Sequence, residues 1–195
     1  MFGRGGEEAQ ALRSAGVPFE IVPGISAAIA APAYAGIPLT HRAFASSVAI
    51  VTGHRAIDGE GSVNWSRLAG AVDTLVIVMG LHNLSEIVAR LLEGNCEPER
   101  PVSLIQWGTR RAQKSLTGTI ASIAELAAAA GFTAPTTIVI GHVLVSPNNC
   151  SGFILLLQVW SLDLRSRSLN SVQAANVEMA DDRANRCCLF INRIA

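Results

Sequence analysis

Three short apolar runs, each stopped by a turn residue and each separated from the next by a helical pattern, constrain the fold of this chain most. They are Thr74–Met79, Val102–Ile105 and Thr136–Ile140. Runs rich in aliphatic and β-branched residues are typical of buried strands. The alternation of such runs with helical segments favours an α/β fold whose sheet has a substantially parallel component.

Capping residues mark the helices between these runs. Asn83, with Glu86 three residues later, predicts a helix start, and Gly94 predicts its end. Thr119 is expected to cap an alanine-rich helix that continues to residue 130. Three further elements are predicted: a helix opened by Glu7 and Glu8 and ended at Gly16, a strand at Ser47–Val51, and a short helix at Val63–Ala69 that carries Trp65.

The stretch Phe19–Arg42 contains a candidate ligand site. Phe19–Val22 is predicted to be a short buried strand that a Pro-Gly pair ends, and Ser26 then caps a helix of small residues. A strand end that leads into a helix start leaves free backbone N–H groups, and ligands dock there in open α/β sheets. The alternative is close packing of the helix on the sheet, which alanine also permits and which composition alone favours.

Composition excludes several classes of protein. The 195 residues carry 15 basic and 15 acidic side chains, so no charge pattern points to nucleic acid or to an anionic membrane surface. No apolar run is long enough to span a bilayer, and the first residues do not resemble a signal peptide. The four cysteines, Cys96, Cys150, Cys187 and Cys188, do not have the spacing of a zinc site. We therefore expect no bound metal and a location in the reducing cytoplasm. We interpret the adjacent pair Cys187-Cys188 as incidental.

The sequence pattern divides the chain into three parts. Residues 1–43 begin with a glycine-rich loop and a helix, and provide only one predicted strand, which is too little for a sheet. We therefore expect them to be the end of an N-terminal α/β domain whose beginning lies before Met1. Residues 44–145 carry a complete α/β pattern. Residues 146–195 lose this organisation, and we expect a weakly structured tail.

Several segments, taken in order, resemble one family. They are FGRGGEEAQALRSAGVPFEIVPGISAAIAAPAYAGIPLTHR, SSVAIVTGH, LVIVMG, WGT and TTIVIG, and they cover residues 2 to about 145. These segments closely resemble the uroporphyrinogen-III C-methyltransferases of the tetrapyrrole (precorrin) methylase superfamily. The long first segment together with VTGH carries most of the specificity.

The resemblance implies a fold and an activity. The family fold has two α/β domains with the cofactor in the cleft between them, and the proteins are usually homodimers. We therefore expect a tetrapyrrole methylase-like α/β fold, with the end of a Rossmann-like N-terminal domain and a C-terminal domain built on a mixed sheet. The implied reaction transfers methyl groups from S-adenosyl-L-methionine to uroporphyrinogen III and gives precorrin-2, on the routes to sirohaem and cobalamin.

The resemblance also implies site residues, carried over position by position. Its cofactor-contacting positions correspond to Met1, Ser26, Ala27, Met79, Gly108 and Thr136. His41 and Arg42 resemble a motif near the cleft, where an arginine fork suits the carboxylates of a tetrapyrrole.

Each of these assignments has a structural alternative. Met79 could be a buried core methionine instead of a soft wall for the cofactor. Arg42 could form a structural salt bridge. The basic cluster at Arg110, Arg111 and Lys114 could be ordinary solvated surface, or it could face an anionic substrate.

The sequence also departs from the family pattern. The Gly/Pro-rich loop with its aspartate, the Tyr-Asp-Arg segment, the proton-transfer lysine and the GGDP motif do not occur in these residues. His41 and His54 have suitable chemistry for a base, but no resemblance assigns them that role. No catalytic residue is therefore named. The predicted function is a truncated methyltransferase with little activity of its own; the alternative is a non-catalytic cofactor-binding or dimerisation module.

Overall fold

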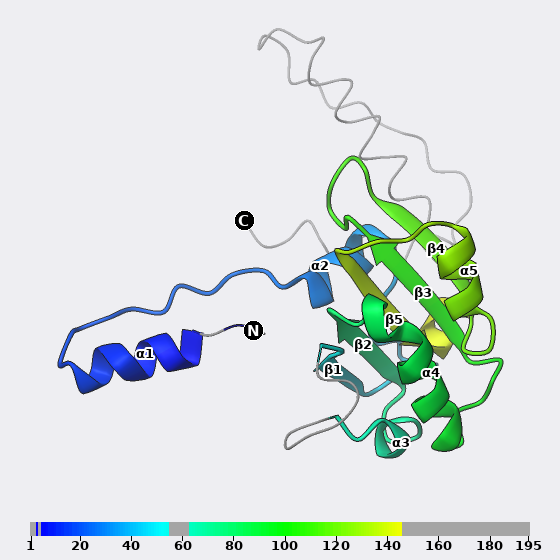
Figure 1. Cartoon of the computed structure of the whole chain (residues 1–195), viewed down its shortest axis with the longest axis horizontal. Helices are drawn as coiled ribbons and strands as arrows, with labels where there is room; N and C mark the ends of the chain where they lie inside the picture. Colours follow the sequence, from blue (N-terminus) through cyan, green and yellow to red (C-terminus); the bar gives the residue numbers. More distant parts are fainter. Residues whose placement is uncertain (1–2, 4, 55–62, 146–195) are drawn as a thin grey trace, which may run out of the picture. The chain divides into compact units, whose positions relative to one another are not determined.

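The structure is a computed structural model that describes residues 3, 5–54 and 63–145 (Figure 1). Met1 and the tail at 146–195 lie outside the described residues. The elements follow the order α1 Gly5–Ser14, α2 Ala27–Tyr34, β1 Val48–Thr52, α3 Trp65–Leu68, β2 Thr74–Val78, η1 Leu81–Asn83, α4 Leu84–Glu93, β3 Pro101–Gln106, β4 Lys114–Thr119, α5 Ile123–Ala129, β5 Thr136–Gly141 and η2 His142–Val145.

Five strands form one mixed sheet in the order β1-β2-β5-β3-β4. β1 and β2 are parallel, whereas β5 runs antiparallel to both of its neighbours and β4 runs antiparallel to β3. The sheet is therefore mixed, as the family resemblance implied, and its parallel component is limited to the pair of β1 and β2. β4 turns back directly beside β3, and β5 then inserts between β2 and β3 in the opposite direction.

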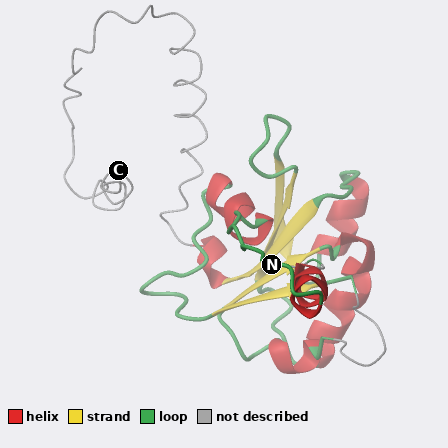
Figure 2. Ribbon diagram, turned by 90° about the vertical axis from the view of Figure 1, so that its left-hand side faces the viewer, coloured by secondary structure: helices red, strands yellow, loops and turns green. Residues whose placement is uncertain are grey.

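Helices cover both faces of the sheet (Figure 2). α3, α4 and α5 pack on one face, against alternate side chains of β2, β3 and β5 such as Ile77, Leu104 and Ile138, all of which are buried. The opposite face buries Ile105 and Val139 under α2 and the segment that follows it. The period-two alternation along each strand thus supplies two separate apolar clusters.

β4 was not expected from the sequence. Lys114–Thr119 is a polar strand at the edge of the sheet, and its exposed first residues give no apolar run to recognise. Thr119 therefore ends a strand and does not cap a helix. The N-cap position of α5 belongs to Ser122, whose hydroxyl accepts a hydrogen bond from the backbone N–H of Thr119 at 3.0 Å.

Phe19–Val22 was predicted to be a buried strand, and this prediction was wrong. No strand is assigned over these residues, and the side chains of Ile21 and Val22 are 74% and 81% exposed. An apolar run becomes a buried strand only where a neighbouring strand accepts its backbone hydrogen bonds. Nothing in the described part of the chain pairs with this run.

The prediction that Asn83 caps a helix holds for its position but not for its side chain. Asn83 occupies the N-cap position of α4 but makes no side-chain cap. Its amide instead donates to the backbone carbonyl of Gly53 at 2.8 Å. Gly53 and Gly80 approach so closely that a Cβ on Gly53 would lie 2.3 Å from the Gly80 Cα. Asn83 therefore ties together the chain segments that leave β1 and β2.

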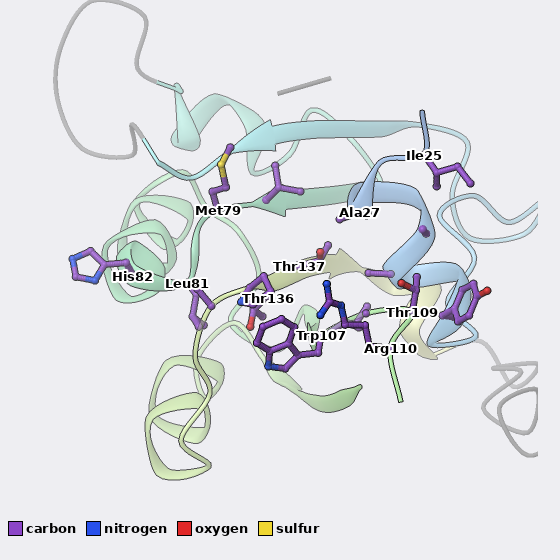
Figure 3. Close-up of a pocket in the computed structure, with 18 residues that line it drawn as sticks. Ile25, Ala27, Met79, Leu81, His82, Trp107, Thr109, Arg110, Thr136 and Thr137 are labelled. Atoms are coloured by element: carbon purple, nitrogen blue, oxygen red, sulfur yellow. The ribbon is translucent and has the colours of Figure 1, made fainter. Parts of the chain in front are cut away.

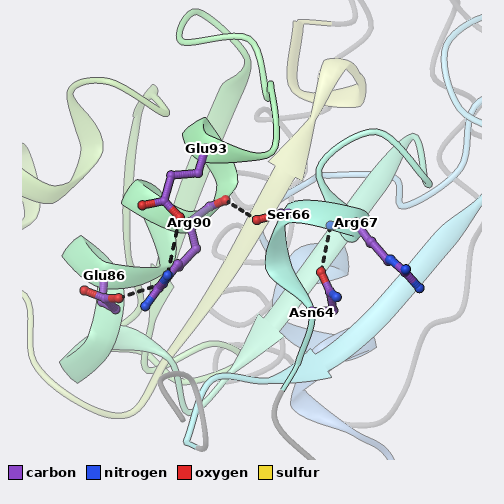
Figure 4. A network of polar contacts seen from close by, with 6 residues as sticks. All are labelled: Asn64, Ser66, Arg67, Glu86, Arg90 and Glu93. Carbon is purple, nitrogen blue, oxygen red and sulfur yellow. Dashed lines mark hydrogen bonds and ion pairs between the residues drawn. The ribbon is translucent and has the colours of Figure 1, made fainter.

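α3 and α4 pack closely at Gly94, which ends α4 as predicted. The hydroxyl of Ser66 donates to the carbonyl of Arg90 at 3.3 Å, and Arg90 pairs with Glu86 at 2.9 Å (Figure 4). Both side chains are more than a third exposed, so water screens the pair and it contributes little to stability. The steric fit matters more, because a Cβ on Gly94 would lie 2.4 Å from the Cα of Ser66.

Gly94→Ala is expected to lower the free energy of unfolding by about 1–3 kcal/mol, because the new methyl group forces α3 away from α4. The φ of Gly94 is −83°, so backbone strain adds nothing to this effect. Urea unfolding of the two proteins measures the difference. Gly70→Ala is the control, since a Cβ there meets no atom within 4 Å; equal losses in the two variants would contradict the steric explanation.

Asp73 connects the starts of the two parallel strands. One carboxylate oxygen accepts hydrogen bonds from the backbone N–H groups of Ser46 and Ser47, at 2.9 and 3.0 Å, and from both of their hydroxyls. β1 and β2 pair from Val48 and Thr74 onward, directly after these residues. The hydrogen bonds, with that of the Ser47 hydroxyl largest, lower the pKa of Asp73 from 3.8 to about 2.

The stabilisation by Asp73 is therefore expected to depend on pH in one direction. Because the folded pKa is depressed, the contribution is complete above about pH 4 and is lost as the pH falls towards about 2. Thermal unfolding between neutral and acid pH should show Asp73→Asn less stable than the parent near pH 7, with the gap closing below about pH 4. A stability difference that stays constant over this pH range would count against the role of Asp73. The same pH dependence in the control variant Glu20→Gln would also count against it.

Candidate functional site

A pocket of about 750 Å³ opens where β2 and β3 end and β5 begins, with α2 across it (Figure 3). This volume lies within the range of small-molecule sites. Carboxyl ends of strands are where ligands dock in α/β sheets. The lining residues are Ile25, Ala27, Ala30, Ala31, Tyr34, Val78, Met79, Leu81, His82, Ile105, Trp107, Gly108, Thr109, Arg110, Ala134, Pro135, Thr136 and Thr137.

α2 forms one wall because its residues are small. The helix begins as predicted, with the Ser26 hydroxyl accepting from the N–H of Ala28 at 3.2 Å. Ala27 and Ala31 both line the pocket, and Ala31, which is 2% exposed, also packs on the loop that follows β3. A Cβ on Gly108 would lie 2.4 Å from the Ala31 Cβ. The same helix therefore serves both purposes that the sequence left open, ligand access and close packing.

Three non-glycine residues of the lining adopt left-handed backbone conformations. The φ angles of Met79, Trp107 and Thr109 are 56°, 51° and 70°. Such conformations cost on the order of 1–3 kcal/mol each and gather at functional sites, where the surrounding structure holds them. All three lie at the mouth of this pocket, just after β2 or β3.

A hydrogen-bond network fixes the opposite wall. The side-chain amide of Gln106 donates to both the carbonyl and the hydroxyl of Thr133, at 2.9 and 2.7 Å. The hydroxyl of Thr136 donates to the same carbonyl at 2.7 Å. Gln106 and Thr136 are 5% and 7% exposed, so these bonds satisfy groups that burial would otherwise penalise. The start of β5 is held rigidly at the pocket.

One permanent charge borders the pocket. The guanidinium of Arg110 lies 5.2 Å from the centre of the Trp107 ring, within range of a cation–π interaction. None of the described residues that line the pocket is acidic. An anionic group would therefore meet a favourable electrostatic environment at this edge.

The structure brings most of the predicted cofactor residues together. Ala27, Met79, Gly108 and Thr136 line the pocket, and Ser26 lines an adjoining cavity of about 580 Å³ that shares Ala27 and Met79 with it. Met79 is 53% exposed, so the alternative of a buried core methionine is wrong. Met1 lies outside the described residues.

The predicted substrate residues do not line this pocket. His41 forms an antiparallel bridge with Ala45, and its Nδ1 accepts from the N–H of Ala43 at 3.1 Å. Arg42 is exposed in the same turn. Their role in substrate binding therefore stays a prediction.

Other lining residues were missed or left undecided. His82 and Tyr34 were not predicted as site residues, although Tyr34 lies within the stretch Phe19–Arg42, because their places depend on how η1 and α2 sit against the sheet. Trp107 belongs to the WGT segment that carries part of the family resemblance, but no role was predicted for it. Of the basic cluster, Arg110 lines the pocket, while Lys114 begins β4.

The chain belongs to the family of Tetrapyrrole (Corrin/Porphyrin) Methylases, whose sequence profile matches residues 1–124. This finding confirms the resemblance inferred from the motifs, and the mixed α/β fold agrees with it.

Individual relatives narrow the comparison. The chain is 47% identical over 144 residues to the uroporphyrinogen-III C-methyltransferase of Bacillus subtilis. The aligned region covers 74% of this chain and 56% of the relative. It is also 47% identical over 144 residues to the siroheme synthase of Methylococcus capsulatus, covering 74% of this chain and 30% of that protein.

A solved structure matches as well. The uroporphyrin-III C-methyl transferase of Thermus thermophilus, complexed with S-adenosyl homocysteine, aligns with a TM-score of 0.63 and 31% identity, covering 74% of this chain and 62% of that one. The chain spans 56–60% of the length of three curated methyltransferase relatives.

Within the described residues, no helix is long and apolar enough to cross a membrane. No group of three or more His, Cys, Asp or Glu side chains arranged to hold a metal ion occurs in the described ranges.

Gly108→Ala is expected to cost about 1–3 kcal/mol of unfolding free energy, because its methyl group collides with Ala31 and pushes the loop off α2. Adding Ala31→Gly removes one colliding methyl group, although glycine in the helix itself costs about 1 kcal/mol. In a double-mutant cycle by urea unfolding, the double variant should therefore lose less unfolding free energy than the sum of the losses in the two single variants. Fully additive losses would mean that the two residues do not contact each other.

Proposed function

We propose that the described part of this chain forms the adenosine-side wall of an S-adenosyl-L-methionine site in a uroporphyrinogen-III C-methyltransferase. The observation that carries the proposal is the convergence of Ala27, Met79, Gly108 and Thr136 on one pocket. These residues come from α2 and from three different strand ends, and the family resemblance assigned them before their positions in space were known.

The pocket fits the cofactor in size and chemistry. Its lining is mostly apolar, which suits an adenine ring, and the glycine at position 108 lets the loop after β3 lie directly against Ala31 of α2. The relative from Thermus thermophilus, solved with S-adenosyl homocysteine, supports the same ligand.

The cofactor, when bound, supplies a methyl group on a sulfonium. The residues of this chain would bind and orient it: Ala27 and Met79 as apolar surface, Ser26 at the start of α2, and Gly108 and Thr136 beside the adenosine. Orientation of reactants supplies a large part of a methyl transferase's rate. None of the described residues is assigned the role of the base.

We propose that the cationic edge of the pocket faces the carboxylates of the tetrapyrrole. Arg110 stands there against Trp107, and a guanidinium fork matches carboxylate geometry. His41 and Arg42, in the turn before β1, remain the substrate residues that the family resemblance suggests. The relatives' names support uroporphyrinogen III as the substrate.

The remaining assignments follow the family. We propose that residues 1–43 belong to an N-terminal α/β domain, that 44–145 form the C-terminal methylase domain, and that 146–195 are a peripheral tail. The exposed apolar side chains of Ile21 and Val22 support the first of these assignments, because they need a partner. A homodimer in the cytoplasm is proposed from the resemblance and from cysteine usage.

The test is binding of S-adenosyl homocysteine to the 195-residue chain by titration calorimetry, with one site per chain expected. Ala27→Leu should weaken binding at least about tenfold, because the larger side chain enters the pocket. Ala27 is exposed and leucine is a good helix former, so stability should hardly change. Ala33→Leu makes the same substitution at an exposed position of α2 outside the lining and should bind normally.

The outcome also separates the two candidate functions. A folded chain with no detectable binding of S-adenosyl homocysteine would refute the cofactor site, and a stable dimer without binding would favour the alternative of a dimerisation module. Robust conversion of uroporphyrinogen III to precorrin-2 by this chain would instead show that its residues suffice for catalysis, contrary to the expectation of little activity.

A further inference from the structure

The loop between β3 and β4 is the strained part of the pocket wall. Trp107 and Thr109 both adopt left-handed φ angles on either side of Gly108, and all three residues line the pocket. A β-branched residue such as Thr109 is especially unfavourable in this conformation. The conformation persists only where surrounding groups hold it.

One side chain holds the strained residue directly. The Oε1 of Gln113 accepts a hydrogen bond from the backbone N–H of Thr109 at 2.8 Å. The backbone N–H of Gln113 in turn donates to the carbonyl of Arg110 at 3.0 Å. This turn keeps the side-chain amide of Gln113 next to the loop. The orientation of the Gly108–Thr109 peptide therefore depends on Gln113.

The other end of the same amide reaches the opposite wall. The Nε2 of Gln113 donates to the backbone carbonyl of Tyr34 at 3.2 Å. Tyr34 is the last residue of α2, where carbonyls lack partners within the helix. A side-chain amide offers an acceptor and a donor at the two ends of one rigid plane, as this bridge requires.

Gln113 is partly buried and is not among the residues that line the pocket. We propose that Gln113 is a positioning residue of this site: its amide sets the separation between α2 and the loop at 107–110 and the direction of the Gly108–Thr109 peptide. This inference rests on the proposed function for its ligand, S-adenosyl homocysteine, but the bridge itself is present without one.

Binding of S-adenosyl homocysteine to Gln113→Ala and Gln113→Glu tests the inference, with Gln10→Ala on α1 as the surface control. Gln113→Ala loses the hydrogen bonds to both Thr109 and Tyr34, so it should bind S-adenosyl homocysteine about tenfold more weakly than the parent. The ratio of the two affinities should not depend on pH. Gln113→Glu keeps the acceptor for Thr109 but loses the donor to Tyr34 at about pH 8. Its affinity should recover only as the pH falls to about 4 and below, where the carboxyl group of an ordinary glutamate becomes protonated and can donate again.

A second readout needs no ligand. Hydrogen exchange of the Thr109 amide should accelerate at least about tenfold in Gln113→Ala and stay near the parent rate in Gln113→Glu, which keeps the acceptor. A merely structural loss of stability would accelerate exchange throughout the sheet, not at Thr109 in particular.

The two readouts separate the possible failures. Unchanged Thr109 exchange in Gln113→Ala would overturn the inference, whatever the affinity. Unchanged affinity in Gln113→Ala, in a parent that binds, would overturn it too. If the parent fails to bind S-adenosyl homocysteine, the proposed function fails, while the Thr109 exchange rate still decides whether Gln113 holds the loop.

Discussion

The insertion of β5 between β2 and β3 is the arrangement on which the rest of the molecule depends. All six residues of β5 are buried, and its two faces separate the cluster under α3, α4 and α5 from the cluster under α2. Because β5 runs antiparallel to both neighbours, its first residues lie beside the last residues of β2 and β3. Three chain segments distant in sequence therefore meet at one edge of the sheet, and the pocket forms there.

The pocket combines rigid support with local strain. Glycines at 53, 80 and 108 allow close approach of backbone, while Asn83 and the Gln106–Thr133 network tie the surrounding segments together. Against this support, Met79, Trp107 and Thr109 hold left-handed conformations that their residue types disfavour. Stability at the far end of the parallel pair comes from different chemistry, the carboxylate of Asp73 on Ser46 and Ser47.

Local patterns predicted the buried strands well, because β2 and β5 are runs of aliphatic residues and burial of such runs leaves few alternatives. The start of α2 at Ser26 followed from its capping chemistry. The polar edge strand β4 escaped prediction, since it buries too little apolar surface to leave a pattern. Phe19–Val22 had the pattern of a strand but no strand to pair with among the described residues.

By itself the sequence determined the family, through long motifs that match it, and the residue types that a cofactor wall requires. Only the tertiary structure decided which of those residues meet. Met79, Gly108 and Thr136 come together because of strand order. Ala27, His82 and Tyr34 join them because α2 and η1 lie against the same edge of the sheet. The role of Gln113 was equally invisible in sequence, because a side-chain amide becomes a bridge only when two backbone groups lie within its reach.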